Sequence, residues 1–128
     1  MEIVQKIYTE NDLDAIIVMP TQFPAFLSTD AQKIGMSPIA ARLAIYWQFP
    51  SGTLPVAIVK EDEQKFEEKL FNDIFTKEIN DTMKGSEGMP MGLEIIGKPF
   101  NDEKVLAIMK ILEEKFKFKE SVEFPTYA

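Results

Sequence analysis

Three short, largely apolar runs along the chain have the length and composition of β-strands. They cover residues 15–20, 54–60 and 91–97, and the first is rich in β-branched residues. Apolarity in these runs is nearly continuous rather than alternating, which is typical of strands that other elements cover on both faces. Proline lies at or near the ends of the runs, where a strand tolerates it. We therefore expect three strands that are buried within a layered protein.

Four further segments place apolar residues at helical spacing. They cover residues 2–10, 38–47, 61–85 and 101–116, and a Ser-Pro pair at 37–38 marks the start of the second. That second segment is apolar nearly all round, so we expect its helix to be buried on most sides. Residues 20–36 lack such a pattern and contain prolines and small polar residues, which predicts a long irregular loop.

The order of these elements predicts the fold class. From residue 54 onward the order is strand, helix, strand, helix, which predicts a βαβ unit with parallel strands and a right-handed crossover. We expect an α/β protein with a partial mixed sheet of about three strands and flanking helices. So narrow a sheet has exposed edges, which native proteins normally cover. Residues 1–128 are then one domain or domain fragment, with 119–128 as a loosely docked tail.

Composition removes several kinds of chemistry. The formal net charge is −7, which disfavours nucleic acid and anionic membrane surfaces as partners. The sequence contains neither cysteine nor histidine, so thiolate nucleophiles, Ser-His-acid triads and most zinc sites are excluded. We expect no metal and no cofactor. No run is long enough to span a membrane and no secretory signal is visible, so an intracellular setting is expected, with cytoplasm and organelle both open.

A few polar residues are candidates for a functional role. Asp12 and Asp14 could form an acid/base or metal site, but a solvated strand entrance is the favoured interpretation. The Gly- and Ser-containing stretch 85–88 resembles an active-site loop, yet no imidazole exists to activate its serine, so an ordinary turn is favoured. Glu94 interrupts the third apolar run. It occupies either an exposed sheet position or one that faces a pocket or a partner subunit.

Aromatic residues concentrate in the first half of the chain. Core packing is the favoured interpretation, because aromatic side chains dominate protein cores. The alternative is the wall of a pocket for an apolar ligand. The candidates for such a substrate-binding wall are Phe23, Phe26, Tyr46, Trp47 and Phe49.

Three separated stretches resemble the C-terminal part of the amidase signature family, and fatty acid amide hydrolases in particular. Their order and spacing agree with the family, and together they extend over nearly the whole chain. They are Asp12-Leu13-Asp14-Ala15-Ile16-Ile17-Val18-Met19-Pro20 with Pro24-Ala25 following, Phe49-Pro50-Ser51-Gly52-Thr53-Leu54-Pro55-Val56, and Gly88-Met89-Pro90-Met91-Gly92-Leu93-Glu94-Ile95-Ile96-Gly97-Lys98-Pro99-Phe100. This sequence departs from the family at Ile45, near a position where Asn is common, and at Glu94, where Gln is usual.

The resemblance implies a piece of a large mixed sheet surrounded by helices, in a family that hydrolyses amide bonds with a Ser–cis-Ser–Lys triad. No position in this sequence matches any of those three residues, so we assign no catalytic residue. In the family, the C-terminal part completes the sheet and helps to wall the substrate cavity, which makes residues 20–28 and 45–53 the candidates here. The resemblance thus implies an apolar amide substrate and a partner segment that carries the triad.

Three functions remain open at this point. The chain is the C-terminal portion of an amide hydrolase that needs a partner segment for activity, or it is a non-catalytic, amidase-derived structural or interaction subunit of a larger assembly. A third possibility is an independent α/β domain that binds a small ligand. Whether the chain takes part in catalysis is therefore open on sequence grounds.

Overall fold

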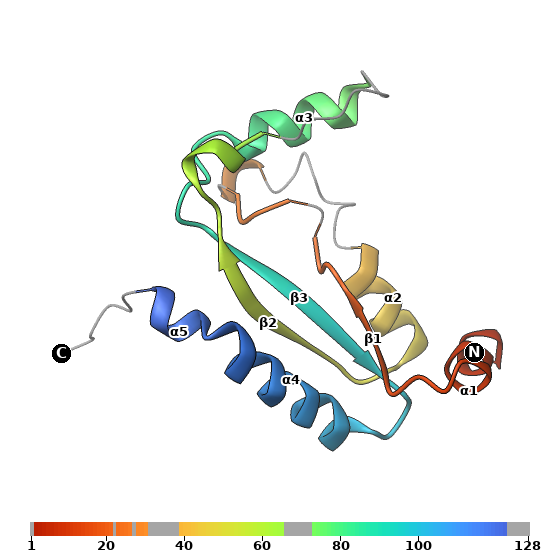
Figure 1. Cartoon of the computed structure of the whole chain (residues 1–128). Helices are drawn as coiled ribbons and strands as arrows, with labels where there is room; N and C mark the ends of the chain where they lie inside the picture. Colours follow the sequence, from red (N-terminus) through yellow and green to blue (C-terminus); the bar gives the residue numbers. More distant parts are fainter. Residues whose placement is uncertain (1, 22, 27, 31–38, 66–72, 123–128) are drawn as a thin grey trace.

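The fold is built around one antiparallel sheet of three strands (Figure 1). It was obtained as a computed structural model, which describes residues 2–21, 23–26, 28–30, 39–65 and 73–122. The strands are β1 (Ala15–Val18), β2 (Ser51–Ile58) and β3 (Pro90–Gly97), in the order β1-β3-β2. The three predicted strands are therefore confirmed, and the longest-range pairing places the first and last of them side by side.

The predicted parallel βαβ unit is wrong, because β2 and β3 pair antiparallel. The chain leaves β2 and returns to the same end of the sheet before β3 begins. Val59 N–H donates to the carbonyl of Met89 at 3.0 Å, and Gly88 N–H donates to the carbonyl of Val59 at 2.9 Å. These bonds close a long hairpin, so the helix between the strands is an excursion from the hairpin and not a crossover.

The helices confirm most of the segments predicted from periodicity. The segment expected at 61–85 begins as a 3-10 turn at Glu61–Glu63 and ends as a helix, while residues 66–72 lie outside the described residues. A second 3-10 turn covers Ser28–Asp30, within the predicted loop. The described helices are α1 (Glu2–Glu10), α2 (Ile39–Trp47), α3 (Ile74–Met83), α4 (Asp102–Phe116) and α5 (Phe118–Ser121).

Two apolar clusters lie on opposite faces of the sheet. On one face, α4 packs against the sheet through Val105, which contacts Leu54 and the fully buried Ile95. On the other face, Tyr8 from α1 and Ala44 from α2 surround Ile96. The second half of the central strand β3, residues 94–97, is therefore buried between helices on its two faces (Figure 1), whereas residues 90–93 are less covered than the sequence predicts.

Burial of β2 alternates, which corrects the prediction that each strand is covered on both faces. Leu54 is buried under α4, whereas Ser51, Thr53 and Pro55 point to the opposite face and are exposed. The reason is that α1 and α2 pack over β1 and β3 and leave this part of β2 uncovered. Burial that alternates in this way is usual for an outer antiparallel strand.

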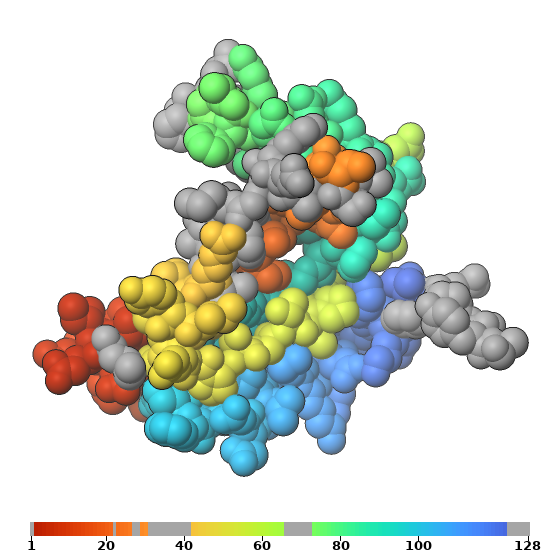
Figure 2. All heavy atoms as spheres, turned by 180° about the vertical axis from the view of Figure 1, so that it is seen from behind, coloured from red at the N-terminus to blue at the C-terminus, as the bar shows by residue number. Residues whose placement is uncertain are grey.

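The helix α2 is also less buried than its composition predicts. Ile45 is 75% exposed and Tyr46 is 85% exposed, while Ala44 is buried and Trp47 is half-buried. In the space-filling view from behind, α2 lies on the surface beside α1 (Figure 2). An apolar helix of this kind fits a protein in which further polypeptide would cover it.

Candidate functional site

The predicted aromatic residues fall into two separate groups. Phe49 is buried between Tyr8 and Trp47, with ring centroids 5.9 Å from each. Phe23 is buried elsewhere and meets the ring of Phe26 edge-on at a centroid distance of 5.6 Å. Tyr46 stands apart because its side chain is almost fully exposed. A common wall formed by all these side chains is therefore not present within the described residues.

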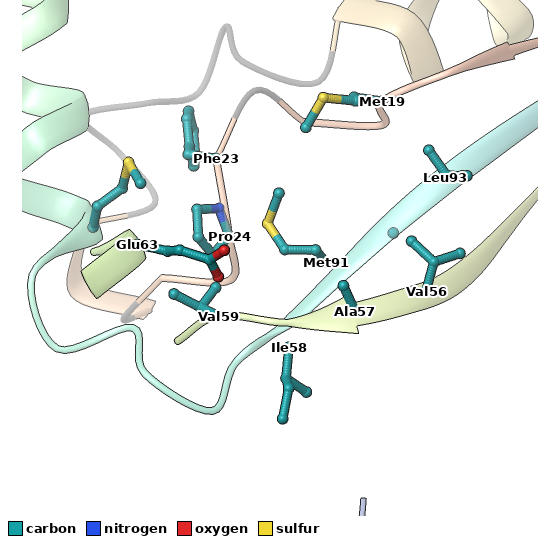
Figure 3. Close-up of a pocket in the computed structure, with 12 residues that line it drawn as sticks. Met19, Phe23, Pro24, Val56, Ala57, Ile58, Val59, Glu63, Met91 and Leu93 are labelled. Carbon is teal, nitrogen blue, oxygen red and sulfur yellow. The ribbon is translucent and has the colours of Figure 1, made fainter. Parts of the chain in front are cut away.

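A cavity of about 340 Å³ lies at the end of β2 (Figure 3). The size is within the range of small-molecule sites, and apolar side chains dominate the lining. Among the predicted residues, Phe23 lines the cavity directly. Sequence reasoning missed the three methionines of the wall, although the first and third stretches of the family resemblance contain two of them, Met19 and Met91. The cavity includes Met19, Pro24, Met83, Met91 and Glu63 in its wall.

The charged residue in this wall is already engaged by its own turn. The Glu63 Oε2 atom accepts a hydrogen bond from the backbone N–H of Lys60 at 3.0 Å, and its Oε1 lies 4.0 Å from Lys60 Nζ. Glu63 is thereby held in a capping arrangement at the 3-10 turn. The remaining lining is suited to an apolar group, because methionine side chains adapt to irregular apolar shapes.

Glu94 is the most unusual polar residue in the described structure. It lies in the middle strand, paired with Val18 on one side and Thr53 on the other, and is 2% exposed. Its Oε2 atom is buried and has no hydrogen-bond partner among the described residues. The interpretation that Glu94 occupies an exposed sheet position is wrong. The alternative, that Glu94 faces a pocket or partner, stays a prediction and is consistent with a buried carboxylate that needs a donor.

The acidic pair before β1 does not form a metal site. Asp12 is exposed, with a backbone φ of 49°. Asp14 forms an ion pair with Lys104 at the start of α4. The hydrogen bond from Lys104, together with its charge, holds the pKa of Asp14 below its usual value. The described residues contain no group of three potential metal-ligating side chains. The two aspartates therefore lie at a solvent-exposed start of β1, as favoured from the sequence, and Asp14 connects this start to α4 through its ion pair with Lys104.

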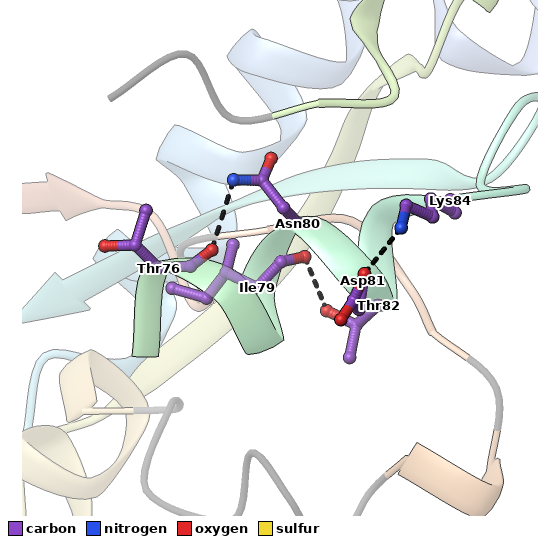
Figure 4. A network of polar contacts seen from close by, with 6 residues as sticks. All are labelled: Thr76, Ile79, Asn80, Asp81, Thr82 and Lys84. Carbon is purple, nitrogen blue, oxygen red and sulfur yellow. Dashed lines mark hydrogen bonds and ion pairs between the residues drawn. The ribbon is translucent and has the colours of Figure 1, made fainter. Parts of the chain in front are cut away.

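The stretch 85–88 is a turn, as favoured from the sequence. Gly85 and Gly88 have φ values of 77° and 76°, which favour glycine. Ser86 is buried, and its backbone N–H donates to the carbonyl of Met83 at 3.1 Å. The nearby Lys84 reaches back to α3 instead, where its Nζ lies 2.5 Å from Asp81 Oδ1 (Figure 4). Lys84 thus forms an ion pair at the end of α3 and does not activate Ser86.

Large apolar side chains are exposed on several helices of the described structure. Ile3 on α1, Tyr46 on α2, Phe75 on α3 and Leu106 on α4 are each more than 60% exposed, and Phe100 between β3 and α4 is 94% exposed. Single exposed apolar residues are normal, and these five lie on separate elements of the described structure. None of the described helices is both long and apolar enough to cross a membrane.

Comparison with known proteins gives a consistent set of relatives. No family model matches the chain. It is 31% identical over 108 residues to fatty-acid amide hydrolase 1 of Sus scrofa, and this match covers 80% of the chain and 18% of that protein. It is 37% identical over 57 residues to the A subunit of glutamyl-tRNA(Gln) amidotransferase from Beijerinckia indica, covering 36% of the chain and 11% of that relative.

The corresponding amidotransferase subunit from a Bradyrhizobium species is 34% identical over 56 residues and is covered over 11% of its length. The chain thus spans less than a fifth of the length of these curated relatives. Over the matched stretches, the chain is a homologue of the amidase signature family, which confirms the resemblance seen in the sequence.

Proposed function

We propose that this chain is the C-terminal portion of an amide-bond hydrolase and that it acts together with a segment that carries the Ser–cis-Ser–Lys triad. The match to fatty-acid amide hydrolase 1 carries this proposal, because it extends over 80% of the chain but only 18% of the relative. The chain would contribute sheet and cavity wall, while the companion would supply the nucleophile and its base. The activity of the whole relative is thereby proposed only for the assembled protein.

The surface of the described structure supports this division of labour. Several helices leave large apolar side chains exposed, among them Tyr46 on α2 and Phe75 on α3, which further polypeptide could cover. The buried Glu94 carboxylate, which lacks a partner among the described residues, points in the same direction. Both features are expected of a piece whose packing and hydrogen bonding are completed by other polypeptide.

The proposed substrate class combines the family resemblance with the apolar lining of the cavity. We propose an amide with an apolar acyl group in contact with Phe23, which lines the cavity and packs edge-on against Phe26. Phe49 packs with Tyr8 apart from this cavity, so only the exposed Tyr46 and the half-buried Trp47 of the second group are proposed as further substrate contacts. The exposed Tyr46 ring would become buried only when the companion polypeptide is present.

The test is an amide-hydrolysis assay with separate and mixed components. The companion is the Sus scrofa relative from which the matched segment has been deleted. We expect no hydrolysis of a long-chain fatty acid amide by this chain alone, none by the companion alone, and hydrolysis when the two are mixed. Activity of the isolated chain would contradict the proposal, and so would a mixed complex that remains inactive on every amide tried.

A second candidate is a non-catalytic component of a larger assembly. Membership of an assembly is supported by the amidotransferase relatives, which are by name one subunit of an enzyme, whereas the non-catalytic role is our proposal. The two candidates differ in the partner recovered when the chain is purified from its native source. A triad-bearing polypeptide at equal stoichiometry supports the hydrolase portion, whereas a large complex without such a polypeptide supports the structural subunit.

A further inference from the structure

The cavity at the end of β2 changes in polarity between its interior and its opening. The side chains of Phe23, Val59 and Met83 are apolar and buried in its wall. Glu63 lies in the same wall, yet its side chain is 53% exposed, so it stands where the cavity meets solvent. Among the lining residues that the structure describes, Glu63 is the one that carries a charge. The cavity therefore has an apolar interior and an anionic opening.

The carboxylate of Glu63 is held with its oxygens toward the cavity. Figure 3 shows it extending from its 3-10 turn into the space between Pro24, Val59 and Met91. The hydrogen bond that Lys60 N–H donates to Oε2 fixes the side chain in this direction. A carboxylate offers about four acceptor positions, and this bond uses one of them. The turn thus orients the carboxylate without saturating it.

The cation that neighbours Glu63 is a weak competitor for this position. Lys60 Nζ lies 4.0 Å from Glu63 Oε1, and the Lys60 side chain is 75% exposed. Ion pairs that are this long and this exposed contribute little, because water screens the charges and the long side chain keeps its freedom. A cation that is held beside Oε1 by an apolar body in the cavity would therefore replace Lys60 at small cost.

These features fit one class of ligand better than the alternatives. A neutral apolar chain fills the interior but brings no charge to the Glu63 carboxylate, and a fatty carboxylate places a second negative charge beside it. A primary ammonium group donates hydrogen bonds and carries the complementary charge. The formal net charge of −7 acts in the same direction, because it attracts cations and repels anions over longer distances.

We infer that this cavity binds a cationic amphiphile, an apolar chain that ends in a primary ammonium group, with the chain against Phe23 and Met91 and the ammonium on Glu63. The methionine side chains of the wall adapt to chains of different shape. The inference goes beyond the proposed function, which uses the apolar lining alone. Because the proposed acyl group contacts the same Phe23, a bound amine would compete with it.

The test uses the full chain alone and three probes that share one apolar chain: octylammonium, octanol and octanoate. Titration calorimetry at neutral pH gives the dissociation constants, and NMR of the methyl groups of Met19, Met83 and Met91 reports whether the probe enters the cavity. We expect octylammonium to bind about threefold to tenfold more tightly than octanol, because a charge-assisted hydrogen bond is stronger than a neutral one and the half-exposed carboxylate is partly screened. Octanoate should bind more weakly than octanol.

Three variants assign the preference to its residue. Glu63→Gln removes the charge but keeps an acceptor for Lys60 N–H, so the turn should remain while the preference for octylammonium over octanol is lost. Glu61→Gln is the matched control, because Glu61 belongs to the same 3-10 turn and does not line the cavity, and it should keep the preference. Lys60→Met removes the competing cation and should strengthen octylammonium binding about twofold. Circular dichroism verifies that each variant folds as the wild type does.

The outcomes are independent of the hydrolysis assay. Equal binding of the three probes, no binding at all, or binding that leaves the methionine signals unchanged would overturn this inference, even if the mixed components hydrolyse amides. A preference that persists in Glu63→Gln, or that Glu61→Gln removes to the same extent, would assign it to the net charge of the chain and would also overturn it. The predicted order of binding in a chain whose mixture with the companion is inactive would support this inference and contradict the proposed function alone.

Discussion

Replacement of Glu94 by glutamine should make the isolated chain more stable. Glu94 lies in the central strand between Val18 and Thr53 and is 2% exposed. Its buried Oε2 atom has no hydrogen-bond partner among the described residues. Glutamine has nearly the same shape, so the packing around it should be kept while the charge is removed. Most buried substitutions destabilise a protein, which makes the expected gain a discriminating result.

The magnitude follows from the cost of an unpaired buried group. A neutral polar group without a partner costs about 1–3 kcal/mol, and a charged one costs more. Glutamine still presents one polar group to the site, so we expect a gain of about 1–2 kcal/mol in the free energy of unfolding. For a chain of 128 residues this corresponds to a melting temperature raised by roughly 3–8 °C. Glu94→Leu, which removes both polar atoms, should gain at least as much.

The assay is urea unfolding of the isolated chain at neutral pH, followed by far-UV circular dichroism. Glu87→Gln is the matched control, because Glu87 is exposed in the turn and its neutralisation should change the stability by less than about 0.5 kcal/mol. A stability loss in Glu94→Gln with the control unchanged would refute the reasoning. It would mean that the carboxylate of Glu94 has a favourable partner in the folded chain.

Three further predictions concern the packing around the sheet. Tyr8→Phe removes a hydrogen bond of 2.9 Å to a β3 carbonyl and should cost about 0.5–1.5 kcal/mol in urea unfolding. Burial raises the pKa of Tyr8. The contribution of Tyr8 to the free energy of unfolding is therefore full below about pH 10 and is lost as the pH rises through the raised pKa. The Tyr8→Phe variant should not show this loss. Gly97→Ala should cost about 1–3 kcal/mol by thermal unfolding, because the new Cβ would lie 2.5 Å from a methyl group of the stiff Val105 side chain. Lys104→Met should be less stable than the wild type, because it removes the partner that lowers the pKa of Asp14. The difference in the free energy of unfolding should be full above about pH 4 and should vanish as the pH falls through the lowered pKa of Asp14. Unfolding measured at a series of acidic pH values tests this.

Local patterns were sufficient to predict the three strands and the helices α1 to α4, but not the short helix α5, which begins at the buried Phe118. The apolar run at 15–20 became β1, and the periodic segment at 2–10 became α1 with the same bounds, Glu2–Glu10. Strand direction was not predictable in this way, because a strand–helix–strand order is also produced by a hairpin with a helix inserted in its loop. The deciding bonds join Val59 to Gly88 and Met89, and no local pattern specifies them.

The degree of burial of each element was the second property that could not be predicted from composition. An apolar helix and apolar strands predict that covering elements exist, but not that those elements belong to the same chain. Within the described structure, Ile45 and Tyr46 of α2 are exposed, and so is one face of β2. Glu94 shows the reverse case, since a charged residue in an apolar strand was as consistent with an exposed position as with the buried position that it occupies.

The candidate site was predictable only in part. Phe23 was singled out because aromatic residues cluster in its part of the sequence, and it does line a cavity. Phe49 and Trp47 come from the same sequence neighbourhood as each other but pack with Tyr8 on a different part of the sheet. The methionines of the cavity carry no polar signal, so only the resemblance to a known family drew attention to the stretches that contain Met19 and Met91, and Met83 lies outside those stretches.

Our central claim is that the exposed apolar surfaces of this chain are completed by polypeptide outside it. The most direct measurement is the melting temperature of the chain as a function of companion concentration, with a dye that reports exposed apolar surface. We predict dye binding by the isolated chain, and stabilisation that grows with companion to about 2.7 kcal/mol at one hundred times the dissociation constant, while the dye is displaced. A cooperative transition that saturating companion does not shift, in a chain that binds no dye, would contradict the claim.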